Sequence, residues 1–236
     1  EQDSFMYQFG VFHEDMHTEA FTWARQTLAY PTPAFANAQD MTAERSAGPL
    51  LGYVDIPGGV FQQGGDPKAA FMFDNEKLAH DVNVKPFSIA KAPVTNKEFS
   101  LFVDDGGYRD KALWDEKAWA YMQGNDQKHP GYWVGQDGSN WAMRRFDQVI
   151  PLPLHEPVSH VNWYEANAYC NWARLRLPTE TEWEVAALGE VAKDGTLAQT
   201  KRKNPWGNTP PDATLANLDG WSLGCIDVAA LPKGDS

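Results

Sequence analysis

Two histidines near the start of the chain, His13 and His17, have the spacing that allows one metal ion to bind both. Residues four apart lie on the same face of an α-helix, so both imidazoles can point to one ion. The same residues match the pattern H-E-x-x-H, in which Glu14 would act as the general base of a zinc peptidase. A third interpretation is that the two rings are buried, hydrogen-bonded parts of a core. The element that carries the pair decides between these possibilities.

The segment from about Phe5 to Leu28 is predicted to be one helix. Apolar residues recur at intervals of three and four, a neighbouring stripe contains both histidines, and no proline occurs before Pro31. This spacing persists for more than five turns. The sequence therefore places the histidine pair on a helix.

The pair still lacks a third metal ligand. Glu19 follows His17 by two residues, so it points to nearly the opposite side of the helix. In a zinc peptidase of this kind, a second helix would supply a carboxylate as the third zinc ligand. Residues 31–50 instead form a connector rich in Pro, Ala and Gly. If both histidines bind metal, a residue from elsewhere must complete a three-ligand face that leaves positions open for substrate and oxygen. His80 and His160 are candidates, although each is expected to be a hydrogen-bonded structural histidine.

Composition excludes several kinds of partner. The chain has 236 residues, of which 42% are hydrophobic, and a formal net charge of −12, which disfavours nucleic acid. No apolar run approaches the roughly 20 residues of a membrane span, and no secretory leader opens the chain. Cys170 and Cys225 are too few for a disulfide framework and are expected to be thiols in a reducing compartment, so we expect a cytoplasmic protein without membrane contact.

After about Gly48 the pattern changes to short strands and helices. Residues 53–56 and 60–65 are predicted to be strands joined by a turn at 57–59, and 82–89 a further strand. Three helices follow, with the expected N-terminal caps Thr95 or Asn96, Asn162, and Thr179 together with Glu182. Helices mixed irregularly with short strands indicate an α+β domain.

Five ordered blocks of this region resemble successive blocks of the formylglycine-generating-enzyme, or sulfatase-modifying-factor, fold. They are Tyr53–Gly65, Phe73–Lys77 with His80, Ala92–Phe99, Pro157–Ala166 and Arg176–Glu184. The resemblance covers roughly residues 51–190, more loosely to Ser236, and implies a C-type-lectin-like α+β core. Formylglycine generators use a pair of cysteines late in the domain. Here Cys170 lies on the buried stripe of a helix and Cys225 is isolated, which disfavours that activity.

The helix upstream, with its pattern H-x-x-x-H-x-E, is similar to the end of the DinB-like helical domain in ergothioneine synthases and their selenoneine-synthase relatives. The resemblance implies that residues 1–48 are the last helix of this bundle plus a connector, that residues 49–236 are the second domain, and that parts of both domains lie outside the chain. It further implies that three histidines bind iron(II), which activates O2 to join a sulfur or selenium donor to the imidazole of hercynine. His13 and His17 match two of these ligands and Glu19 matches the acidic end of the motif; the third ligand belongs to an earlier helix.

One position departs from the pattern. Ergothioneine synthases commonly have Gln immediately before the second histidine, whereas this chain has Met16, whose thioether cannot donate a hydrogen bond. The difference favours the selenoneine-synthase branch, with cysteine, γ-glutamylcysteine or a selenosugar left open as donor. We expect the histidines to face a cleft between the helix and the second domain, with Met16 lining or underlying it. The alternatives are the zinc peptidase and a non-catalytic lectin-like binding module.

Overall fold

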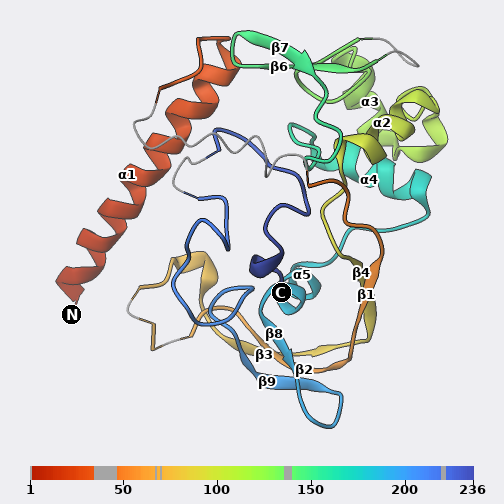
Figure 1. Cartoon of the computed structure of the whole chain (residues 1–236). Coiled ribbons are helices and arrows are strands. Elements are labelled where there is room, and N and C mark those ends of the chain that lie inside the picture. Colours follow the sequence, from red (N-terminus) through yellow and green to blue (C-terminus); the bar gives the residue numbers. More distant parts are fainter. Residues whose placement is uncertain (1, 35–46, 67, 70, 136–139, 219–221) are drawn as a thin grey trace.

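The computed structural model describes residues 2–34, 47–66, 68–69, 71–135, 140–218 and 222–236. It contains one long helix, α1 (Gln2–Thr27), and a region of mixed helix and sheet. Figure 1 shows α1 along one side of the molecule, with its C-terminal end beside the hairpin of β6 and β7. The helix and the mixed helix-and-sheet class predicted from sequence are both confirmed. None of the described helices is long and apolar enough to cross a membrane.

The β structure of the described residues consists of four small antiparallel sheets. In chain order the strands are β1 (Tyr53–Ile56), β2 (Gly59–Gln63), β3 (His80–Val84), β4 (Phe87–Ala90), β5 (Trp133–Val134), β6 (Ala142–Arg145), β7 (Gln148–Pro151), β8 (Gly189–Val191) and β9 (Leu197–Lys201). β1 pairs with β4, β2 with β3, and β8 with β9, while β5, β6 and β7 form a three-stranded sheet.

The turn predicted at residues 57–59 does not reverse the chain. Tyr53 lies opposite Ala90 and Gly59 lies opposite Val84, so one register continues across both sheets. Residues 53–63 and 80–90 therefore form a single bent ribbon with Pro57 opposite Pro86. Because proline has no N–H to donate to a ladder, the ribbon is interrupted there. The same interruption divides the strand predicted over residues 82–89 into β3 and β4.

Of the four α-helices that the structure describes in the mixed region, three begin at caps expected from the sequence, whereas the helix capped by Asp115 was not predicted. The four helices are α2 (Asn96–Asp104), α3 (Glu116–Gly124), α4 (Trp163–Ala173) and α5 (Glu180–Leu188). Thr95, Asn162 and Thr179 each accept a hydrogen bond from the backbone of a glutamate three residues later, whose side chain accepts one in return. Of the two caps proposed for α2, the structure uses Thr95.

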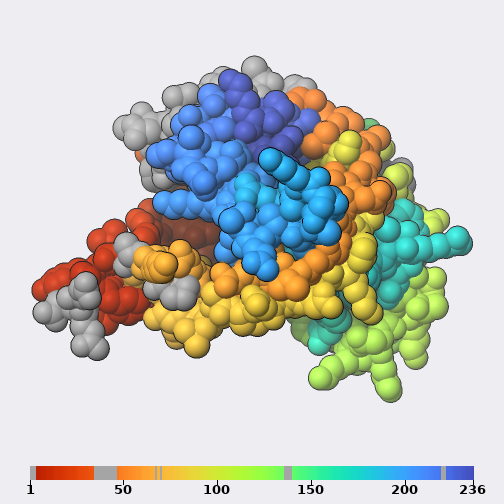
Figure 2. Space-filling view, turned by 90° about the horizontal axis from the view of Figure 1, so that it is seen from below, coloured from red at the N-terminus to blue at the C-terminus, as the bar shows by residue number. Residues whose placement is uncertain are grey.

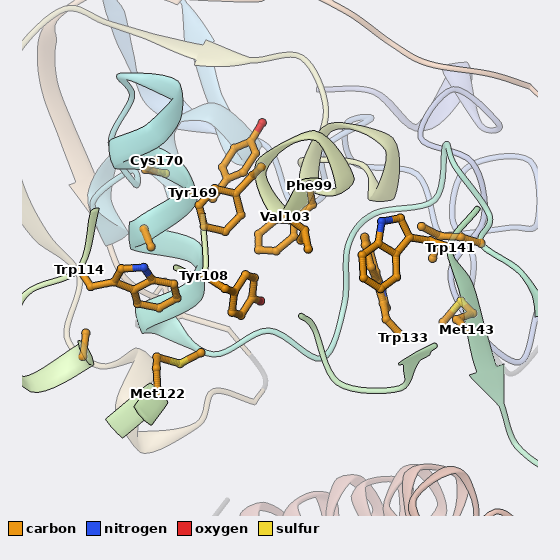
Figure 3. Packing of buried hydrophobic residues seen from close by; sticks show 14 residues of the cluster. Phe99, Val103, Tyr108, Trp114, Met122, Trp133, Trp141, Met143, Tyr169 and Cys170 are labelled. Carbon is orange, nitrogen blue, oxygen red and sulfur yellow. The ribbon is translucent and has the colours of Figure 1, made fainter. Parts of the chain in front are cut away.

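An aromatic core joins α2 to α4 (Figure 3). Phe99 of α2 stacks on Tyr169 of α4 with 5.3 Å between ring centroids, and Trp133 and Trp141 extend the cluster toward β6. A second cluster contains Phe61, Val84, Val185 and Leu197, which hold β2, β3, α5 and β9 together. The core therefore lies away from α1, whose attachment depends on other contacts.

Candidate functional site

The structure places His13 and His17 on the same face of α1. Their ring centroids are 4.6 Å apart with an interplanar angle of 47°, and both side chains are exposed. The described residues of this chain therefore do not bury the pair in a core. Two accessible imidazoles at this separation are available for a shared ligand.

The separation fits two imidazoles that bind one metal ion side by side. A nitrogen bound at about 2.1 Å puts its ring centroid about 3.2 Å from the metal, so two metal–nitrogen bonds at right angles put the two centroids about 4.5 Å apart. The observed 4.6 Å agrees with this value. The separation is therefore compatible with both rings binding one metal ion.

The described residues do not supply a third ligand. Among them no group of three or more His, Cys, Asp or Glu side chains is arranged to hold a metal. His80 is exposed on β3, with Nδ1 2.9 Å from the carbonyl oxygen of Leu78. His160 packs edge-on against Tyr132 at 4.6 Å, and burial, followed by the charge of Arg144, lowers its pKa. Neither histidine is brought to the pair on α1.

A phenylalanine cluster attaches the first half of α1 to the loop before β3. Phe71 lies 5.2 Å from Phe5 and 4.7 Å from Phe12, and Phe73 lies 6.3 Å from Phe9, between ring centroids. Phe9 also stacks on His13 at 5.7 Å. The cluster thus holds the helix through nonpolar contacts and restricts the ring of the first histidine.

Hydrogen bonds attach the other end of α1 to the β6–β7 hairpin. The Gln26 side chain donates from Nε2 to the Arg144 carbonyl oxygen at 2.9 Å and accepts at Oε1 from the Phe146 N–H at 2.6 Å. Arg144 donates in return to the Gln26 carbonyl oxygen at 2.6 Å. The sequence analysis missed these residues because they are more than a hundred positions apart and no local pattern links them.

Met16 and Glu19 are both exposed on α1, and Met16 retains 48% of its accessible surface. At 100° per residue, Met16 lies within the phenylalanine face, between Phe5 and Phe9, and Glu19 lies 200° from His17. Figure 2 shows α1, in red, at the floor of a hollow between blue C-terminal segments and orange-yellow segments. An open space therefore lies beside the helix. That the two histidines face it remains a prediction.

The cysteines do not form a reactive pair. Cys170 is buried, Cys225 is partly buried, and both are free thiols. Burial raises the pKa of each thiol, with Glu156 adding to the effect at Cys225. Because the thiolate is the reactive form, a raised pKa opposes nucleophilic or metal-binding chemistry at either residue.

The buried carboxylate of Glu165 has a structural role and is not part of the candidate site. Glu165, 1% exposed, accepts hydrogen bonds from the Tyr108 hydroxyl, from Gln127 at 2.8 Å and from the Asn162 N–H at 2.7 Å. Burial raises the pKa of Glu165, while these hydrogen bonds oppose that rise. The network secures the N-terminus of α4 to the preceding loops.

Comparison with known proteins shows similarity to two kinds of enzyme. The model of the sulfatase-modifying factor enzyme 1-like domain matches residues 38–223. A hercynine oxygenase of Mycolicibacterium thermoresistibile is 43% identical over 166 residues, which cover 70% of this chain and 35% of that protein. A hercynine oxygenase of Mycobacterium tuberculosis is 37% identical over 235 residues, 99% of this chain and 53% of that protein. A formylglycine-generating enzyme of Thermomonospora curvata is 34% identical over 183 residues, 71% of this chain and 56% of that protein. The chain thus spans about half the length of the relatives it matches, or less.

Proposed function

Since this chain belongs to the family of sulfatase-modifying factor enzyme 1-like domains, we propose that it is part of an iron(II)- and O2-dependent enzyme that oxidises hercynine. The observation that carries the proposal is the pair of exposed imidazoles, 4.6 Å apart, on a helix attached to a domain of this family. The names of the relatives support hercynine as the substrate. The two free thiols suit a cytoplasmic enzyme.

We assign His13 and His17 as two iron ligands, each through an imidazole nitrogen. When bound, iron(II) would offer open coordination positions and activate O2, and O2 would supply the oxidising equivalents for the substrate. The ring of Phe9 against His13 limits the orientations available to that ligand.

The outward face of α1 supports the proposal of a helical bundle. Tyr7, Val11 and Phe21 retain 78%, 62% and 71% of their accessible surface. Large apolar side chains gathered on one helix are typical of a surface that another element covers. We propose that residues 1–48 end a DinB-like bundle, that its other helices cover this face, and that one of them supplies the third histidine. Residues 49–236 would form the second domain.

For the second substrate we propose a selenium or sulfur donor, with the selenoneine branch favoured. Met16 is exposed on α1 immediately before His17, and its thioether is soft, polarisable and unable to donate a hydrogen bond. Such a side chain suits contact with a sulfur or selenium atom. Glu19 lies on another side of the helix and would contact the surrounding helices of the proposed bundle, not the metal.

The experiment uses the full-length protein. Iron content is measured after anaerobic loading, and products are identified by mass spectrometry after aerobic incubation of hercynine with cysteine, γ-glutamylcysteine or a selenosugar. His13→Ala and His17→Ala should lose most of the iron and the activity, whereas His80→Ala, which removes an exposed imidazole of β3, should retain both. Stoichiometric iron in the double variant His13→Ala/His17→Ala would refute the assignment.

The alternatives have less support. A zinc peptidase is not supported by the relatives named above, which are hercynine oxygenases and a formylglycine-generating enzyme. A non-catalytic lectin-like module would explain the aromatic core but not two adjacent, exposed imidazoles. The hercynine assay separates all three, because only the proposed enzyme consumes O2 with hercynine.

A further inference from the structure

We propose that Gln26 and Arg144 are positioning residues that fix the rotation of α1 about its axis, and with it the direction of His13 and His17. The inference rests on the proposed function of the two histidines. It concerns a part of the molecule that touches neither of them, the junction between the end of α1 and the β6–β7 hairpin.

Gln26 makes a two-point contact. Its side-chain amide donates to one backbone group and accepts from another, at Arg144 and Phe146, as a neighbouring strand would. Gln26 is 9% exposed and is the only buried residue of α1 among those whose side chains are described. A single hydrogen bond allows a helix to pivot, whereas two bonds from one planar amide define its orientation, because hydrogen bonds weaken steeply away from linearity.

Arg144 completes the junction from the other side. Its Nη1 donates to the Gln26 carbonyl oxygen at 2.6 Å and to the Phe146 carbonyl oxygen at 2.8 Å. Its guanidinium lies 4.6 Å from the centroid of the Tyr132 ring, and the Tyr132 hydroxyl is 3.0 Å from Oγ1 of Thr27. A cation at a helix C-terminus satisfies carbonyls that have no partner within the helix. The end of α1 is therefore held by reciprocal bonds with defined directions.

The other attachment of α1 lacks such direction. The contacts of Phe5, Phe9 and Phe12 with Phe71 and Phe73 are nonpolar, and hydrophobic contact tolerates rotation and sliding. The junction at Gln26 thus controls the angle of the helix, while the phenylalanine cluster holds the helix against the domain.

A small rotation would disturb the metal ligands. Gln26 is nine residues from His17, about 13.5 Å along the axis at a rise of about 1.5 Å per residue. A rotation of about 10° moves a ring nitrogen that lies about 6 Å from the axis by about 1 Å. Metal–ligand distances tolerate only about 0.2 Å. Loss of the junction should therefore affect the iron site before it affects the fold.

The test measures iron in Gln26→Leu and Arg144→Met variants of the full-length protein. Gln127→Leu is the matched control, because it removes a glutamine that hydrogen-bonds to Glu165 inside the domain and does not contact α1. For each protein we measure the affinity for iron(II), the electron paramagnetic resonance spectrum of the iron–nitric oxide complex at saturating iron, and the melting temperature. Arg144→Lys, which keeps the charge, should recover part of the affinity.

We expect Gln26→Leu and Arg144→Met to weaken iron binding about 10- to 100-fold and to broaden the spectrum. Gln127→Leu should change neither the iron affinity nor the spectrum, even if it lowers the melting temperature as much as the two junction variants do. If His13→Ala abolishes iron binding but Gln26→Leu and Arg144→Met match the wild-type affinity and spectrum, the positioning role is refuted and the proposed function stands. If His13→Ala retains the iron, the proposed function fails, and the positioning role fails with it.

Discussion

Substitution of Phe71 by alanine should release the first half of α1 without unfolding the domain. The half-buried ring contacts Phe5 at 5.2 Å, Phe12 at 4.7 Å and Phe73 at 4.9 Å. Partial burial of a phenylalanine contributes about 1 kcal/mol, and each aromatic pair adds about 0.5–1.5 kcal/mol. Because these contributions overlap, we expect Phe71→Ala to weaken the attachment of the first half of α1 to the domain by about 2–4 kcal/mol in total.

The loss is measured by hydrogen exchange of the backbone amides of α1. A change of about 1.4 kcal/mol corresponds to a factor of ten, so the equilibrium constant for opening of this segment should rise roughly 30- to 700-fold. The exchange rate of an unfolded chain is the upper limit. Half of this helix alone is too short to be stable in water. The melting temperature should change little, since Phe71 lies outside both core clusters.

Phe87→Ala is the matched control for this experiment. Phe87 is also partly buried, but it packs against the second core cluster instead of against α1. It should lower the melting temperature and leave exchange of α1 unchanged. Equal exchange of α1 in Phe71→Ala and the wild type, or faster exchange spread evenly over the whole domain, would refute the reasoning.

Three further predictions follow from named side chains. Glu14→Gln should keep most of the hercynine-oxidising activity, whereas a zinc peptidase would lose nearly all hydrolysis, so a complete loss in the hydrolysis assay would favour the peptidase. Met16→Gln should change the ratio of turnover with sulfur and selenium donors more than it changes iron affinity, and an unchanged ratio would remove Met16 from the donor site. The hydrogen bond from Arg176 lowers the pKa of Glu182 to about 2, so its stabilisation is complete above about pH 4.5 and is lost as the pH falls toward 2. Because Arg176 is 63% exposed, we expect about 1 kcal/mol or less, measured as a flatter dependence of melting temperature on pH in Glu182→Gln.

Features set by neighbouring residues were predictable from the sequence. The spacing of apolar residues predicted α1, and the pairs Thr95 with Glu98 and Thr179 with Glu182 predicted where two helices begin. These features depend on contacts within one turn of helix, so the pattern contains most of the information that decides them.

Features set by distant residues were not predictable in this way. Pro57 and the following glycines have the composition of a reversing turn, yet the chain bends there without reversing, because residues 80–90 provide a partner for both strands. The junction of Gln26 with Arg144 likewise depends on how the β6–β7 hairpin is placed. The spacing of the histidine pair is local and could be recognised in the sequence, whereas the proposed third ligand would have to come from another element.

The small size of the sheets has a consequence for how such a domain can change during evolution. The widest sheet among the described residues has three strands, so the aromatic core, instead of one continuous ladder, joins the parts. An insertion in one loop then disturbs two or three strands at most, and the cost of accommodating a longer loop rises only slowly with its length. Loops can be exchanged at small expense in stability, and a domain of this architecture can acquire new substrates by changing its loops while its core is kept.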